Sequence, residues 1–96
     1  MISKEDAMFT IGYEGLLAVI DGKAKARYRK LSAMDLARKG LFRAAFTAIL
    51  YTDDQAQFQA FADHYNQAAG TKLSTIEEFK RLFGVNIESI KRTMVL

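Results

Sequence analysis

The sequence predicts an α+β fold in which a small N-terminal antiparallel β-meander or hairpin packs against three to four helices. Half of the 96 residues are hydrophobic, 26% are charged and none is cysteine, which is the composition of a globular domain without a disulfide framework. Residues 10–29 combine glycines with strand-like alternation, whereas from residue 32 onward apolar residues recur at helical spacing. No linker-like stretch divides the chain, so we expect one domain over residues 1–96.

A short helix is expected first, over residues 4–9. Ser3 stands three positions before Asp6. This spacing is typical of a helix start, where a serine hydroxyl accepts a hydrogen bond from a backbone N–H of the first turn.

The following stretch, residues 10–29, is interpreted as strands joined by tight turns. The pair Asp21-Gly22 lies between two candidate strands and is a strong hairpin signal, which predicts a positive φ at Gly22. A weaker turn is expected at Glu14-Gly15.

The main alternative is an all-α fold in which residues 4–20 form one long helix. Internal glycines argue against it, because each costs about 1 kcal/mol relative to alanine in a helix. Gly12 and Gly15 would both lie inside that helix.

Beyond Ser32, polar caps and glycines divide the chain into helices. Helices are expected to start at Ser32, at the pair Asp53-Asp54 and at the pair Ser74-Thr75. The expected ends are Gly40, Gly70 and Gly84. Residues 41–51 are apolar nearly all round, as in a helix at the centre of the packing. The tail, residues 90–96, favours a strand that either returns to the sheet edge or frays.

The aromatic residues are expected to form the core. The phenylalanines on the later helices fall on their apolar stripes and are Phe42, Phe46, Phe58, Phe61, Phe79 and Phe83. We predict that Phe46 and Ile49 are almost completely buried. The alternative is that some of these aromatics form an exposed cluster and mark an interface.

The only histidine and the aspartates do not form a recognisable catalytic or metal-binding pattern. His64 falls at the boundary of a polar helix face, without an orienting partner. Asp53 and Asp54 stand at helix-cap positions, and Asp63 lies more than two turns further on. The glycines match no phosphate-binding motif. We therefore predict no catalytic residue, no metal and no cofactor.

Positive charge is concentrated in one part of the chain. Residues 22–43 carry eight basic side chains against one acid, a net charge of +7 in a chain whose total is +3. A strand over residues 23–29 would place alternate cations on one face. The candidate contacts to nucleic acid or to an acidic partner are Lys23, Lys25, Arg27, Arg29 and Lys30. The simpler interpretation is a solvated edge strand whose lysines block aggregation.

These observations favour a small non-enzymatic protein that acts as a protein–protein interaction module, with self-association as an open alternative. The second hypothesis is a nucleic-acid-binding accessory protein that uses the basic strand at residues 23–30. No apolar stretch reaches the roughly 20 residues needed to span a membrane, and no secretory signal is recognised, so we expect no membrane association and a cytoplasmic location.

Overall fold

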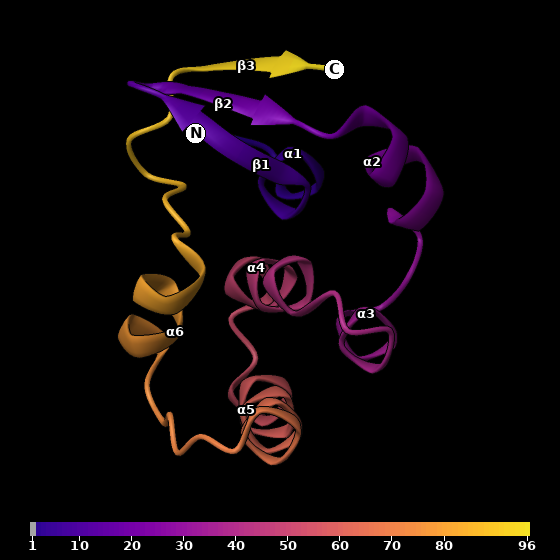
Figure 1. Ribbon diagram of the computed structural model, residues 1–96, viewed down its shortest axis with the longest axis vertical. Helices are drawn as coiled ribbons and strands as arrows, with labels where there is room; N and C mark the ends of the chain where they lie inside the picture. Colours follow the sequence, from indigo (N-terminus) through magenta and orange to yellow (C-terminus); the bar gives the residue numbers. More distant parts are fainter. Residues whose placement is uncertain (1) are drawn as a thin grey trace.

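The computed structural model describes residues 2–96 and has an α+β fold, as predicted. Six helices and a three-stranded sheet are found in these residues (Figure 1). The helices are α1 (Lys4–Met8), α2 (Gly22–Tyr28), α3 (Ala33–Arg38), α4 (Phe42–Thr52), α5 (Gln55–Ala69) and α6 (Ile76–Phe83), and the strands are β1 (Thr10–Glu14), β2 (Leu17–Ile20) and β3 (Arg92–Val95). The sheet lies at one end of the molecule, and α4 lies between it and α5 (Figure 1).

The sheet begins with the hairpin expected at Glu14-Gly15. Strands β1 and β2 pair antiparallel with Glu14 opposite Leu17, so Gly15 and Leu16 form a two-residue loop. Gly15 has φ +58°, which a glycine at the first central position of such a loop adopts without steric cost. The alternative all-α fold is therefore wrong, because residues 4–20 form a short helix and then a hairpin.

The C-terminal tail returns to the sheet edge and completes it. Strand β3 pairs parallel with β2, with Leu17 opposite Arg92 and Ile20 opposite Val95. The sheet order is β1-β2-β3, so the sheet is mixed and not purely antiparallel as predicted. The parallel partner arrives from the far end of the chain, after all six helices.

The second predicted hairpin, at Asp21-Gly22, is wrong. Residues 22–28 form helix α2, and Asp21 is its N-cap, with a side-chain oxygen 3.1 Å from the backbone nitrogen of Ala24. Gly22 is not among the residues with positive φ. Alanine, lysine and arginine are strong helix formers, and aspartate followed by glycine suits a helix start as well as a turn. Ala24 and Tyr28, four residues apart, share one helix face.

The expected helix starts and ends are confirmed in most cases. Ser32 caps α3, Asp54 caps α5, and Thr75 and Glu78 form a capping box on α6. Gly40, Gly70 and Gly84 follow α3, α5 and α6 with left-handed φ values. Asp53 differs from its predicted role, because it ends α4 in the left-handed conformation instead of beginning α5.

The core is the aromatic cluster predicted from the sequence. Phe46 is fully buried and Ile49 nearly so. The Phe46 ring lies 5.9 Å from Phe61 and 5.5 Å from Phe79, measured between ring centroids. Offset and edge-on aromatic pairs at these distances add to the free energy gained by burial. Helices α4, α5 and α6 are therefore joined through their phenylalanines.

Candidate functional site

The predicted basic side chains do not form a row on one face. Because α2 is a helix, Lys23 and Arg27 lie on one side of it, and Lys25 and Arg29 on another. Lys30 follows in the turn after the helix. Lys25 is moreover occupied by an ion pair, with its Nζ 2.7 Å from Oδ1 of Asp6. The strand-borne cation row is thus wrong, and the role of these five residues in binding remains a prediction.

Two open hollows adjoin each other along one edge of the sheet, with volumes of about 310 and 460 Å³. Both are lined by Thr10, Ile11 and Arg43. We call this combined surface the β1 groove. Its further lining comes from α2, the start of α4 and the end of α6, and consists of Met8, Phe9, Gly12, Tyr13, Asp21, Ala24, Tyr28, residues 40–42, Ala44, Phe83 and Gly84.

The β1 groove follows the free edge of β1. Residues 10–13 are consecutive in β1 and all line the groove, whereas no residue of β2 does. Since β1 pairs only with β2, the backbone N–H and C=O groups on its other edge point away from β2 and have no partner in the sheet. Ile11 sits at a register irregularity between Thr10 and Gly12, and its side chain is 61% exposed.

Arg43 lies between the two hollows and joins several elements. Its Nε donates to the carbonyl oxygen of Phe83 at 3.2 Å, Nη1 to that of Ala7 at 3.2 Å, and Nη2 to the hydroxyl of Tyr13 at 3.0 Å. The Tyr13 hydroxyl also accepts from the backbone N–H of Asn86 at 3.1 Å. This cluster ties β1 and α1 to the end of α6.

No carboxylate in residues 2–96 forms an ion pair with Arg43. The ion pairs found in residues 2–96 involve the cations Lys25, Arg38 and Lys80. Arg43 is half-buried, and its three partners are two carbonyl groups and a phenol. A guanidinium carries five N–H groups, so two remain after these three bonds.

The start of α4 adds to the positive character of the groove. Its N-cap is Leu41, which makes no side-chain cap hydrogen bond. The first backbone N–H groups of a helix have no partner within the helix, and together they carry a partial positive charge. Residues 41–44 line the groove, so this charge lies beside Arg43.

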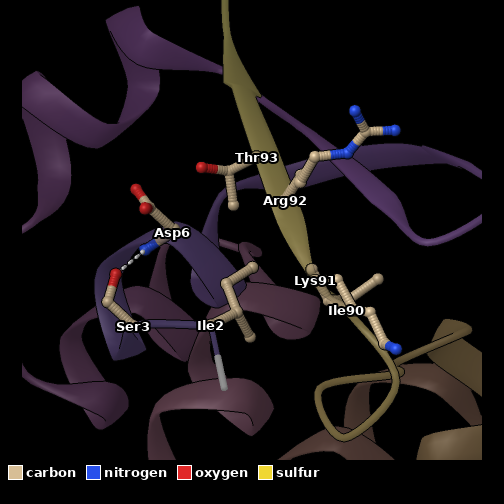
Figure 2. A pocket seen from close by; sticks show the side chains of 7 residues that line it. All are labelled: Ile2, Ser3, Asp6, Ile90, Lys91, Arg92 and Thr93. Carbon is tan, nitrogen blue, oxygen red and sulfur yellow. Dashed lines mark hydrogen bonds between the residues drawn. The ribbon is translucent and has the colours of Figure 1, made fainter.

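A different, polar hollow of about 450 Å³ lies between α1 and the beginning of β3. Figure 2 shows the Thr93 hydroxyl directed toward the side of the hollow where Asp6 lies, while Arg92 and Lys91 extend away. The Asp6 carboxylate is already paired with Lys25. The hollow therefore lacks the converging acid, base and nucleophile that an active site needs.

The other polar residues considered from the sequence, His64 and Asp63, make contacts with neighbouring side chains of the fold. His64 is half-buried, and its ring centroid lies 6.0 Å from that of Phe42. Asp63 accepts a hydrogen bond from Gln59 on the same helix. Within residues 2–96, no group of three or more histidines and carboxylates is placed to hold a metal ion.

Sequence reasoning missed Arg43 and Ile11 as members of a common surface. Arg43 was counted only as part of the basic window. A usable signal was present, because Arg43 is the only charged residue in residues 41–52, a segment that is otherwise almost entirely apolar. A lone charge inside a central helix requires specific partners. Ile11 gave no signal, because an apolar residue in a strand is ordinarily expected on the buried face, whereas here its side chain is exposed.

Comparison with known protein families, curated proteins and solved structures finds no match to this chain. Among the described residues, none of the helices combines the length and the apolar character required to cross a bilayer.

Proposed function

We propose that this chain is a non-enzymatic protein–protein interaction module whose partner docks in the β1 groove. The observation that carries this proposal is the combination of an open strand edge with exposed apolar surface, centred on Ile11. Exposed apolar surface favours association in water, and the unpaired backbone groups of a strand edge are a template for pairing with another chain, so one bound protein segment can use both. A cytoplasmic setting belongs to the same proposal and is compatible with the lack of cysteine.

Site-specific photo-crosslinking tests this proposal. The photoreactive residue p-benzoylphenylalanine replaces Ile11 in one version of the protein and Gln67 in a matched control. Gln67 is exposed on α5 and does not line the groove. We expect irradiation in extract from the native cell to give a discrete protein adduct from position 11 only.

The adduct, identified by mass spectrometry, distinguishes the possible partners. An adduct with another protein, or with a second copy of this chain, supports the proposal, and sedimentation then separates the two. Equal adducts from positions 11 and 67, or none from either, contradict it.

Nucleic-acid binding is the second candidate, and one observation favours it. Lys23, Arg27, Arg29 and Lys30 are exposed on or just after α2 and have no ion-pair partner among residues 2–96. If Lys23, Arg27 and Lys30 contact phosphates, the binding constant for duplex DNA should fall with salt concentration, with a slope of about −3 on logarithmic axes. Lys23→Glu combined with Arg27→Glu should then remove most of the binding, with Lys72→Glu as the control for general charge.

A further inference from the structure

We propose that the partner segment binds as an added β-strand on the free edge of β1 and places a carboxylate side chain on Arg43. This inference rests on the proposed function, because it specifies the chemistry of the segment that occupies the β1 groove. Its ligand class is an extended acidic segment of another protein.

The strand edge sets the backbone conformation of the partner. An extended peptide beside β1 can pair with the N–H and C=O groups that β1 directs away from β2. Gly12 contributes no side chain to obstruct this approach, and a Cβ built there meets nothing within 4 Å. The space for the new backbone is given by the two hollows, which residues 10–13 of β1 line.

Charge complementarity selects an acidic occupant. Arg43 has two N–H groups left after its three hydrogen bonds. The Tyr13 hydroxyl accepts two hydrogen bonds, and its own hydrogen has no acceptor among residues 2–96. A carboxylate between Arg43 and Tyr13 would accept from both, in charge-assisted bonds that are roughly twice as strong as neutral ones.

Two further features of the groove favour an acidic occupant over a basic one. The uncapped start of α4 adds partial positive charge. Asp21, the acid at the far end of the groove, already accepts the backbone N–H of Ala24 in its capping role. Asp21 is the one carboxylate among the described residues that line the groove, so a basic segment would find little negative charge there.

The apolar hollow next to Arg43 adds a second requirement. Its walls include Tyr28, Leu41 and Phe42, all half-buried. In a strand, side chains on the same side recur at every second residue. A segment that directs a carboxylate to Arg43 should therefore carry a large apolar side chain two residues away. The expected pattern is an acid and an apolar residue at alternate positions.

The opposite edge of the sheet is a weaker candidate for the same role. Strand β3 is exposed along its whole length, but the hollow beside it is polar and its acid, Asp6, is paired with Lys25. Lys91 and Arg92, which form no ion pair among residues 2–96, extend away from this hollow (Figure 2).

A random octapeptide library displayed on phage, selected against the whole chain, tests the inference. We expect enrichment of peptides with an aspartate or glutamate two positions from a large apolar residue. One enriched peptide is then synthesised, and its affinity is measured by fluorescence anisotropy. Replacing its acid by the matching amide should weaken binding roughly tenfold or more. N-methylation of its backbone should abolish binding at alternate residues and be tolerated at those between.

Substitutions in the protein test the same contact between Arg43 and the peptide carboxylate. Arg43→Lys keeps the charge but loses the bidentate donor geometry of the guanidinium. We expect it to weaken binding of the acidic peptide more than binding of the amide version. Lys72→Gln removes a positive charge outside the groove and should leave binding unchanged. Because Arg43 also joins several elements, the peptide substitutions decide the question if Arg43→Lys does not fold.

The outcomes separate this inference from the proposed function. Peptides that shift the amide resonances of Ile11 but show no acid preference overturn the carboxylate assignment and leave the groove as a docking site. Uniform tolerance of N-methylation overturns strand addition. A library with no enriched peptide also overturns the inference, while the crosslinking at position 11 still decides the proposed function.

Discussion

The carbonyl oxygen of Leu96 occupies the space in which a side chain on Gly22 would begin. A Cβ built on Gly22 would stand 2.5 Å from that oxygen and 2.8 Å from Cγ1 of Val95. Leu96 is also held by its backbone N–H, which donates to the carbonyl of Ile20 at 3.0 Å. The start of α2 and the end of β3 are thus packed backbone to backbone.

Replacing Gly22 with alanine should destabilise the protein. Neither the helix start nor β3 can accept a methyl group at this distance without moving, and overpacking of this kind costs about 1–3 kcal/mol. Urea unfolding monitored by circular dichroism measures the change in the free energy of unfolding. Gly12→Ala is the control, because that position has open space and no positive φ. Equal stabilities of the two variants would contradict the close approach.

Phe46 should be one of the most sensitive core positions. It is fully buried and packs against Phe61, Phe79 and Phe83. Phe46→Ala should lower the free energy of unfolding by about 3–5 kcal/mol, which is a large part of the stability of an ordinary small domain. The comparison is Leu82→Ala, since the Leu82 side chain is 50% exposed. A loss below about 1 kcal/mol at Phe46 would be incompatible with this core.

The hydroxyl of Tyr13 should contribute to stability through its two hydrogen bonds. Tyr13→Phe removes the acceptor of an Arg43 N–H and of the Asn86 N–H; because both bonds are solvent-exposed, we expect a loss of only about 0.5–1 kcal/mol. Hydrogen exchange should show faster exchange at the amide of Asn86. Tyr28→Phe is a matched control, because its hydroxyl makes no hydrogen bond among residues 2–96. Unchanged exchange at Asn86 would contradict the cluster.

The elements predicted correctly are those whose signals are local. Ser32 and Gly40 delimit α3 by cap chemistry within a few residues. In α5, apolar residues that recur every three or four positions form the stripe Phe58, Phe61, Ala62 and Tyr65. These features depend on neighbours in the sequence. They can therefore be predicted from the sequence without knowledge of the tertiary structure.

The incorrect prediction at Asp21-Gly22 has a tertiary cause. Aspartate followed by glycine suits both a turn and a helix start, and the Ala-Lys alternation after it is compatible with either. The edge of β2 on which the predicted strand over residues 23–29 would pair is occupied by β3, from the far end of the chain. The parallel pairing of β3 with β2 likewise cannot be predicted from the residues of β3 and their neighbours in the sequence.

The candidate site was only partly predictable for the same reason. The excess of positive charge near residues 22–43 was evident. The placement of Arg43 against Tyr13 and Phe83 depends on contacts between residues 30 and 40 positions apart. The free edge of β1 depends in turn on which side β3 joins the sheet.

The stability of α6 should depend on pH through Glu78. The carboxylate accepts hydrogen bonds from the backbone N–H of Ser74 and from the hydroxyl and N–H of Thr75, and these bonds lower the pKa of Glu78 below its ordinary value of 4.5. A lowered folded-state pKa means that the folded protein binds this proton less readily than the unfolded chain does. The stabilisation is therefore complete above the unfolded-state pKa and is lost as the pH falls through the lower, folded-state value.

Glu78→Gln removes this titration while keeping an acceptor oxygen of similar size. We expect the wild-type protein to be the more stable of the two at pH 7, and the difference to shrink toward pH 3, as measured by urea unfolding at each pH. Glu77→Gln is the control, because Glu77 lies in the same first turn of α6 but makes none of the capping hydrogen bonds. Its difference from wild type should change less over the same range. If the two variants respond to pH alike, the helix dipole acts on both carboxylates and the capping box adds nothing specific.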